Sequence, residues 1–472
     1  MILVDARGRP CAPHIGGRAT LDDLFKRAAT RRPDAMALLD APDRERVSDG
    51  APRALTYRQA DRVVSAIAGR LRRMGLHTDA IVAIQMASTV ENVLTILGVL
   101  RAGLIAMPLP VWWRRADIIA ALNRIGPMAL IVSSRIAAGD HYQLAIRVAA
   151  EVFPIRYVCG YGRNTPDGLV CFDDLFTVDE IDPLPAWGEG RAAQPGPGAH
   201  LAAVTWGMST DGLVPVARSH AELIAGGLAV TLESRLRQDA NLLSTLTLSS
   251  FAEIASTMVP WLLVGGTLAL HHPFDLDAYL AQFTTLNADC VLLPGSIAGQ
   301  LAEGSRPRMG TVSPDIIAVW RAPERLTQAL PWRDAGARMT DILAFGEVGL
   351  VAARRGRSGK PAIIPFGMVP APRAAASNNI IVAEIRPTAK GTVAMRGPMV
   401  PQAPFPSGAE RGRAPYLRIS ANGYVDTGSP CRPNTAAMVV TGPPPGMATV
   451  GDYPSAFEQP VMSVDGPLTA IA

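Results

Sequence analysis

Three short glycine-containing segments carry residue types suited to binding a phosphorylated ligand. The first combines hydroxyls with glycine and includes Thr205, Ser209, Thr210 and Gly212. Small residues let backbone N–H groups approach an anion, and hydroxyls donate further hydrogen bonds to it. The segment follows an apolar run, 201–204, that predicts a strand, and it precedes a predicted helix. A loop of this composition at the start of a helix could bind an anion.

The same segment also contains residues that oppose phosphate binding. Trp206 and Met208 are bulky, and we expect them to crowd the approach of a ligand to the backbone. Asp211 places a negative charge beside the expected anion, which is unfavourable unless a metal intervenes. The segment has no lysine, so Arg218 is its one source of full positive charge. A strand–loop–helix connection that binds no ligand therefore remains an alternative.

Two later segments complete the set. Phe345, Gly346 and Glu347 form the second, where a glutamate stands between glycines in an apolar run. Such a glutamate is unusual for a solvated surface turn. The third segment ends in Asp426 and Ser429, whose side chains offer oxygen atoms for hydrogen bonds. A strand end followed by a turn is the alternative interpretation of this third segment.

The elements expected to position these residues alternate between helix and strand. Apolar residues at helical spacing predict helices over 20–32, 56–74, 90–102 and 116–124. Short apolar runs between them predict buried strands over 81–86, 104–110 and 130–133. This rhythm favours a parallel sheet with helices on its faces. A second alternating block follows from residue 201, and after residue 354 short strands separated by proline and glycine favour an antiparallel barrel.

The predicted fold class is therefore α/β, with two parallel-rich α/β subdomains and a small antiparallel barrel-like subdomain. We expect the boundaries to be 15–186, 200–353 and 354–440, with a remnant of a further α+β domain over 441–472.

Composition excludes several classes of protein. Hydrophobic residues make up 48% of the 472-residue chain, and 45 basic against 41 acidic residues give a net charge of +4, so no nucleic-acid surface is expected. The five cysteines are scattered without a CxxC pair, which indicates neither a disulfide framework nor a zinc site and favours a cytoplasmic location. No signal peptide is expected, and Pro260 interrupts the longest uncharged stretch, so no membrane span is expected.

In their order along the chain these segments resemble the AMP-forming acyl-CoA synthetases, luciferases and peptide-synthetase adenylation domains. The resemblance covers roughly residues 20–458. It rests on the Leu55-Thr56-Tyr57 element, the helix–strand corner 98–109 and the Ser219-His220 end of the first segment. The segments 341–349, 391–398 and 423–429 resemble that family's "YGxTE", "GeixvrGp" and "GfxxTGD" motifs.

The resemblance implies roles for the candidate residues. The hydroxyl-rich segment would wrap the phosphates of ATP, Phe345 would flank the adenine, and Glu347 would hold Mg²⁺, which takes oxygen ligands. Ser429 stands where the family has an aspartate that grips the ribose hydroxyls, and Asp426 is a candidate substitute. The implied substrates and partners are ATP, Mg²⁺, a carboxylic acid, CoA, and a carrier protein or pathway enzymes.

Several residues that the family's chemistry uses are missing. The chain has three lysines in all, Lys26, Lys360 and Lys390, so neither the first segment nor the stretch after 390 contains one. Pro443 replaces the hinge arginine, and the segment 450–458 resembles the start of a C-terminal domain that is then cut short at Ala472. We therefore expect a degenerate, C-terminally truncated relative.

Three hypotheses follow. The first is slow or impaired ATP-dependent activation of a carboxylic acid, expected to be a fatty acid, to acyl-AMP and then to acyl-CoA or another thioester. The second is a non-catalytic protein that binds an acyl group or nucleotide as a regulator or scaffold. The third is a decaying reading frame. Loss of one preorganised donor typically lowers a rate by about 10²–10³-fold, which is why slow catalysis is expected.

Overall fold

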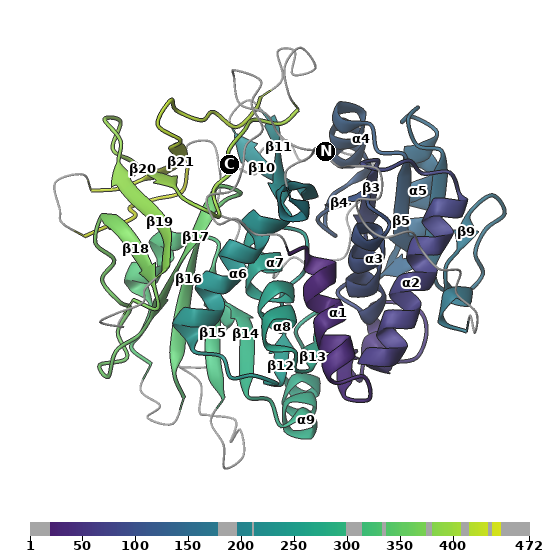
Figure 1. The fold of residues 1–472 in the computed structure, drawn as a ribbon, viewed down its shortest axis with the longest axis horizontal. Coiled ribbons are helices and arrows are strands. Elements are labelled where there is room, and N and C mark those ends of the chain that lie inside the picture. The colour runs from purple at the N-terminus through teal and green to yellow at the C-terminus, as the bar shows by residue number, and fades with distance from the viewer. Residues whose placement is uncertain are drawn as a thin grey trace.

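The structure is a computed structural model that describes residues 19–177, 196–209, 212–298, 314–332, 337–373, 380–406, 415–432 and 437–444. Two large sheets lie on either side of a central group of helices, and a smaller sheet lies beside the larger one (Figure 1).

The larger sheet has eight strands, in the order β17-β16-β15-β14-β12-β13-β1-β2. The six inner strands run parallel, and the two edge strands β17 and β2 run antiparallel to their neighbours. Strands β12, β13, β14 and β16 are buried at every residue, as expected for a parallel sheet covered by helices. The strands are β1 (Met36–Leu39), β2 (Ala54–Thr56), β12 (Leu242–Ser244), β13 (Leu268–Leu270), β14 (Cys290–Pro294), β15 (Asp315–Trp320), β16 (Met339–Phe345) and β17 (Gly349–Arg354).

The second sheet has seven strands, in the order β11-β10-β4-β3-β5-β8-β9. All of its neighbours are parallel except β10 and β11, which form an antiparallel hairpin at one edge. A two-stranded ribbon of β6 (Arg135–Ile136) and β7 (Gly139–Asp140) stands apart. The seven strands are β3 (Ile81–Gln85), β4 (Ile105–Pro108), β5 (Ala129–Ser133), β8 (Tyr157–Tyr161), β9 (Val170–Cys171), β10 (Leu201–Ser209) and β11 (Gly212–Ser219).

Helices fill the space between the two sheets and cover the outer face of the second. Helices α1, α2, α3, α6, α7 and α8 share one hydrophobic core with both sheets, whereas α4 and α5 belong to a separate core on the outer face of the seven-stranded sheet. No helix in the described ranges is long and apolar enough to cross a bilayer. The helices are α1 (Leu21–Arg31), α2 (Tyr57–Arg73), α3 (Val90–Arg101), α4 (Arg115–Ile125), α5 (His141–Ala149), α6 (His220–Ser234), α7 (Phe251–Ser256), α8 (Met258–Val264) and α9 (Leu276–Leu286), with 3-10 turns η1 (Arg44–Arg46), η2 (Asp173–Phe176), η3 (Pro197–Ala199) and η4 (Pro323–Gln328).

Capping boxes fix the starts of two helices that border the candidate site. The Ser219 hydroxyl accepts a hydrogen bond from the Glu222 N–H at the start of α6, and the Glu222 carboxylate accepts one from the Ser219 N–H. Ser250 and Glu253 make the same exchange at the start of α7. Each box satisfies two backbone donors that a helix otherwise leaves unpaired. Both helices therefore begin at a defined residue.

The third sheet is antiparallel throughout, in the order β18-β19-β20-β21. The predicted fold class is confirmed: two parallel-rich sheets with helices and a small antiparallel sheet. The residue boundaries of the subdomains stay a prediction, and β1 and β2 join the larger sheet although they come before all strands of the other. The remnant predicted over 441–472 lies outside the described residues except for 441–444. The strands are β18 (Gly367–Ala371), β19 (Ile380–Pro387), β20 (Thr392–Arg396) and β21 (Val425–Pro430).

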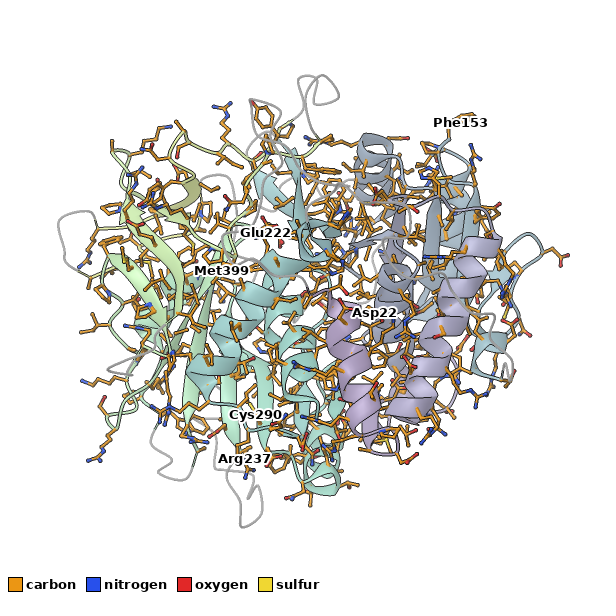
Figure 2. All side chains as sticks on the ribbon, in the orientation of Figure 1. Asp22, Phe153, Glu222, Arg237, Cys290 and Met399 are labelled. Atoms are coloured by element: carbon orange, nitrogen blue, oxygen red, sulfur yellow. The ribbon has the colours of Figure 1, made fainter. Side chains whose placement is uncertain are left out.

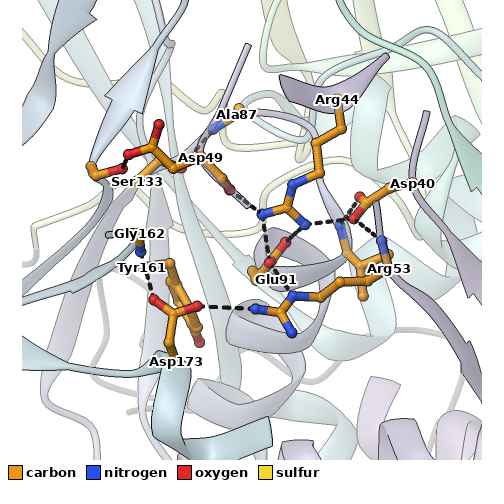
Figure 3. Close-up of polar contacts among 12 residues, drawn as sticks. Asp40, Arg44, Asp49, Arg53, Ala87, Glu91, Ser133, Tyr161, Gly162 and Asp173 are labelled. Atoms are coloured by element: carbon orange, nitrogen blue, oxygen red, sulfur yellow. Dashed lines mark hydrogen bonds and ion pairs between the residues drawn. The ribbon is translucent and has the colours of Figure 1, made fainter. Parts of the chain in front are cut away.

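A buried network of ion pairs joins β1 and the segment after it to α3 (Figure 3). Arg44 pairs with Asp40 at 2.6 Å and with Glu91 at 2.7 Å, and all three side chains are at most 4% exposed. Arg53 pairs with Glu91 and, at 3.0 Å, with Asp173 of η2. Asp40 also accepts a hydrogen bond from the Val90 N–H, the first residue of α3. Every charge in this network thus faces an opposite one.

Candidate active site

The candidate residues gather where parallel strands end. Glu347 follows β16, Arg321 follows β15, and the segment 245–250 follows β12, so all three lie at the carboxyl edge of the larger sheet. The β10–β11 hairpin reaches the same place from the other sheet, since β10 runs parallel to β4. Ligands of open α/β sheets bind outside the carboxyl ends of strands. Position alone therefore favours a ligand site here.

The hydroxyl-rich segment, predicted as a loop, is instead an antiparallel hairpin. Its strands pair continuously from Ala203 with Arg218 to Ser209 with Gly212. Thr210 and Asp211 lie outside the described residues. The correction has a physical cause: alternating valine, alanine and hydroxyl residues favour extended backbone, and tight pairing satisfies their polar groups.

Because side chains alternate along a strand, the hairpin has two distinct faces. Thr205, Gly207 and Ser209 share one face, and Arg218 lies on the same face because it pairs with Ala203. A carbon atom built onto Gly207 would lie 3.8 Å from Cβ and Cγ of Glu347, so this face meets the glutamate. The hairpin therefore places Thr205 and Gly207 against Glu347, and Ser209, further along the same face, donates its hydroxyl to the Gly212 carbonyl oxygen at 3.1 Å.

The bulky residues point the other way, so the predicted crowding by Trp206 is wrong. Trp206 is 8% exposed and packs edge-on against Trp113, with 5.8 Å between ring centroids. It belongs to the outer core with Val204 and Ala217. Met208 alternates to the same face and is 60% exposed. Neither side chain covers the face that meets Glu347.

Glu347 lies in the turn between β16 and β17 and is 7% exposed. Its Oε2 accepts a hydrogen bond of 2.9 Å from the backbone N–H of Phe251, the first residue of α7. The Thr205 hydroxyl also interacts with this carboxylate, while 3.4 Å separates it from the Val216 carbonyl oxygen. Burial raises the pKa of Glu347, and these hydrogen bonds oppose that shift. The carboxylate is thus held in place mainly by neutral donors.

Arg218 does not serve as the phosphate-binding cation expected from the sequence. Its side chain is fully buried, and its guanidinium donates to the carbonyl oxygens of Glu347, Val348 and Met399. It also lies over the Phe251 ring, 3.9 Å from the centroid. Burial lowers the pKa of Arg218 to about 10. The residue is a clamp that ties the hairpin to the Glu347 turn.

A second arginine, which the sequence analysis did not single out, lies nearer to solvent. Arg321 directly follows β15, and its side chain is 33% exposed. It forms an ion pair of 3.5 Å with Glu253, and its guanidinium lies 5.6 Å from the Trp112 ring centroid. Its charge also lowers the pKa of Glu347. The one signal in the sequence was an arginine immediately after a predicted buried strand.

The other predicted residues lie in two places. Phe345 is 1% exposed, and Gly346 beside it is exposed with a φ of +52°, a conformation that favours glycine. Ser429 is buried in β21, and its N–H donates to the Thr427 hydroxyl at 3.2 Å. Asp426 is exposed and accepts from the Gly428 N–H at 2.9 Å. The hydrogen bonds described for Ser429 and Asp426 thus lie within their own strand.

The site suits Mg²⁺ held together with a substrate. Among the described residues no group of three or more His, Cys, Asp or Glu side chains could bind a metal ion unaided. Mg²⁺ commonly uses one or two carboxylates and completes its shell with phosphate oxygens and water. Glu347 supplies one carboxylate, and the Thr205 and Ser209 hydroxyls lie on the face beside it.

Comparison with known proteins agrees with this geometry. Long-chain fatty acid transport protein 1 of Bos taurus is 32% identical over 168 residues, which are 36% of this chain and 24% of that protein. The apo structure of MbtA from Mycobacterium smegmatis superposes with a TM-score of 0.66 at 18% identity, covering 90% of this chain and 76% of that one. The anthranilate CoA ligase AuaEII in complex with anthranoyl-AMP gives 0.62 at 17% identity, over 86% and 77%. At these identities the solved structures establish the fold alone.

The family comparison covers most of the two sheets. The model of the AMP-binding enzyme family matches residues 25–324, more than half of the chain. The matched range contains the β10–β11 hairpin, the start of α7 and Arg321. The chain belongs to the family of AMP-binding enzymes.

Proposed function

We propose that this chain activates a carboxylic acid with ATP, forming an acyl adenylate whose acyl group then passes to CoA or another thiol. The observation that carries the proposal is the hairpin face that places Thr205 and Gly207 beside the buried Glu347, with Ser209 further along the same face. Hydroxyls suit phosphate oxygens, a glycine leaves room for them, and a lone carboxylate suits a metal that those oxygens share.

The reaction begins when a carboxylate oxygen attacks the α-phosphorus of ATP. The bond between the α-phosphorus and its bridging oxygen breaks, and pyrophosphate leaves. A thiolate then attacks the acyl carbon, and AMP leaves. Mg²⁺, when bound, would neutralise charge on the phosphate oxygens, with Glu347 as its protein ligand. Thr205 and Ser209 would donate hydrogen bonds to the phosphates, and Arg218 would hold the Glu347 turn.

We propose that this catalysis is slow. Adenylation brings two anions together, so its rate depends on preorganised positive charge. Arg218 donates to backbone carbonyls, the hairpin contains no lysine, and a serine stands at 429. Each missing donor would lower the rate by about 10²–10³-fold if the losses were independent, and they combine to less than their product.

The acid stays open between two chemical types. The sequence resemblance led us to expect a fatty acid, and the bovine relative is named a long-chain fatty acid transport protein. AuaEII, in contrast, is an anthranilate ligase captured with an aromatic acyl adenylate. A carrier protein is a candidate thiol acceptor beside CoA. The scattered cysteines support a cytoplasmic location as part of the proposal.

A non-catalytic binding protein is the second candidate function. The observation that favours it is the state of Glu347, which is buried and already accepts a hydrogen bond from Phe251. A protein of this kind would keep the pocket for a nucleotide or acyl group and regulate or scaffold related enzymes.

ATP–pyrophosphate exchange, measured with a panel of fatty and aromatic acids, distinguishes the two functions. Exchange that depends on one class of acid and is lost in Glu347→Ala supports the ligase. Glu45→Ala, which replaces a glutamate of the short turn η1, is the control and should exchange as the wild type does. Absence of exchange together with saturable binding of a non-hydrolysable acyl-AMP analogue, measured by calorimetry, would establish the binding protein instead. Absence of both would contradict the proposed function.

A further inference from the structure

Among the described residues, Glu253, Glu347, Arg218 and Arg321 bring full charges to the candidate site, and Glu222 lies near enough to Arg218 to act on it. An anionic ligand would meet repulsion from Glu253 and Glu347, so its binding depends on which arginine it can reach. The two arginines differ sharply in this respect.

Arg218 is turned away from any ligand. It is fully buried, and three backbone carbonyl oxygens already accept its N–H groups. Rotating it toward a ligand would leave those buried carbonyls without a donor, which is unfavourable. Arg218 therefore stays with the Glu347 turn.

Arg321, unlike Arg218, is reached by solvent. Its side chain is a third exposed, and the 3.5 Å that separate it from Glu253 exceed the roughly 2.7–2.9 Å of a strong charged hydrogen bond. Glu253 accepts four other hydrogen bonds, from the Thr247 hydroxyl, the Ser249 hydroxyl and the N–H groups of Ser249 and Ser250. Those bonds satisfy Glu253, so the carboxylate does not depend on Arg321 for its hydrogen bonds.

Trp112 keeps Arg321 at the mouth of the site. Trp112 follows β4 of the seven-stranded sheet and Arg321 follows β15 of the eight-stranded sheet, so their contact spans the two. The 5.6 Å between guanidinium and ring centroid lies within the range of a cation–π interaction. Both side chains are partly exposed, at 38% for the tryptophan residue. A ligand can therefore approach the guanidinium from solvent.

We propose that Arg321, supported by the Trp112 ring, is the residue that binds an oxyanion of the ligand in place of the lysine that the hairpin lacks. The assignment rests on the proposed function and adds to it a binding residue from another element of the fold. The oxyanion has two sources in that reaction, the phosphate of the nucleotide and the carboxylate of the acid. A guanidinium recognises both by paired N–H donors.

The test compares binding by the full-length chain and its variants in calorimetry, with ATP, AMP and a panel of carboxylic acids each titrated alone. Arg321→Gln removes the charge and keeps hydrogen-bonding capacity, whereas Arg321→Lys keeps the charge. Arg325→Gln removes the same charge four residues further along in η4 and is the matched control. Because Arg321 is partly exposed, the variants should fold, and thermal denaturation verifies this.

We expect Arg321→Gln to weaken ATP and AMP binding by about 10- to 100-fold, as a lost charged hydrogen bond would. Arg321→Lys should recover part of it, and Trp112→Leu should weaken it by about two- to fivefold. If only the acids bind more weakly, the assignment holds and the oxyanion is the carboxylate. Equal binding by wild type, Arg321→Gln and Arg325→Gln overturns the assignment while the proposed function stands. A wild type that binds neither nucleotide nor acid overturns both.

Discussion

Among the buried regions where arginine and carboxylate side chains meet, two differ clearly in their arrangement. In the network of Asp40, Arg44, Arg53, Glu91 and Asp173, each arginine pairs directly with carboxylates (Figure 3). At the candidate site Arg218 lies next to Glu347 but donates to its backbone carbonyl. The Glu347 carboxylate accepts instead from a backbone N–H and interacts with the Thr205 hydroxyl.

The difference separates charges that hold the fold from charges kept available for a ligand. A buried ion pair compensates the cost of taking both charges out of water, and it leaves neither charge for another partner. A buried carboxylate without an ion pair keeps that cost until a cation arrives. Burial raises the pKa of Glu347, whereas the pairs with Arg44 and Arg53 outweigh burial and lower the pKa of Glu91. At Asp40 in the same network, burial and the charge of Glu91 outweigh Arg44 and raise the pKa to about 6. Stability and function should therefore respond oppositely to matched substitutions.

The largest effect is expected in the network. Glu91→Gln leaves Arg44 and Arg53 without their shared carboxylate, and breaking a buried pair typically costs about 3–5 kcal/mol of folding free energy. Urea denaturation should show the midpoint falling with an unchanged slope. Arg58→Gln, which breaks an exposed pair with Asp34, is the control and should leave the urea midpoint nearly unchanged. A shift as small for Glu91→Gln would erase the distinction between the regions.

Glu347→Gln should act on function and leave the fold intact. The substitution keeps the size of the side chain and removes a buried charge, so the free energy of unfolding should stay equal or rise. Exchange activity should fall by about 10²–10³-fold, about 3–4 kcal/mol in transition-state stabilisation. Initial rates at several Mg²⁺ concentrations measure this loss. A variant that unfolds as readily as Glu91→Gln would place Glu347 among the structural charges.

Glu222 offers a comparison by pH at the start of α6. Burial raises its pKa to about 7, partly opposed by Arg218, so the folded chain holds a proton that the unfolded chain releases above about pH 4.5. This contribution to stability is present below pH 4.5 and is lost as pH rises toward 7, by up to about 3 kcal/mol. Glu222→Gln should remove that part of the decline, as denaturation at pH 5 and pH 7.5 would show. If wild type and variant lost stability equally between pH 5 and pH 7.5, the raised pKa of Glu222 would be contradicted.

Much of the fold could be predicted because buried apolar residues recur at regular spacing along the sequence. The apolar runs 81–86 and 104–110 became β3 and β4, and helical spacing over 56–74 became α2. The sequence does not show that β1 and β2 join the eight-stranded sheet, because strand pairing depends on packing between residues far apart in the sequence.

The site was harder to predict because the roles of its residues depend on contacts between segments that are far apart in the sequence. Glu347 was identifiable from its apolar setting, and its burial agrees with that reading. Trp206 leaves the face toward Glu347 open because side chains alternate along a strand. The sequence predicted a loop at this position and so gave no such alternation. Arg218 and Arg321 are both arginines, so the sequence cannot tell them apart. Their exposure and partners in the structure identify Arg218 as a clamp and Arg321 as a candidate ligand-binding residue.

The smallest effect is expected where the two regions are most alike, at Arg218. Arg218→Lys keeps the positive charge but replaces a planar fork by a single ammonium, which cannot reach the carbonyls of Glu347, Val348 and Met399 in the same geometry. We expect a loss of about 1–2 kcal/mol in stability, close to the cost of one unsatisfied buried carbonyl. Function should change through the position of Glu347: the Mg²⁺ concentration for half-maximal exchange should rise severalfold, while the KM for the acid stays unchanged. Arg237, at the lower end of the molecule in Figure 2 and far from Glu222 and Met399, gives the control Arg237→Lys, which should alter neither quantity.

A stability loss in Arg218→Lys with an unaltered Mg²⁺ requirement would reduce Arg218 to a purely structural charge. The clamp would then belong with the network of Asp40 and Glu91, and Glu347 would be positioned by Phe251 and Thr205 alone.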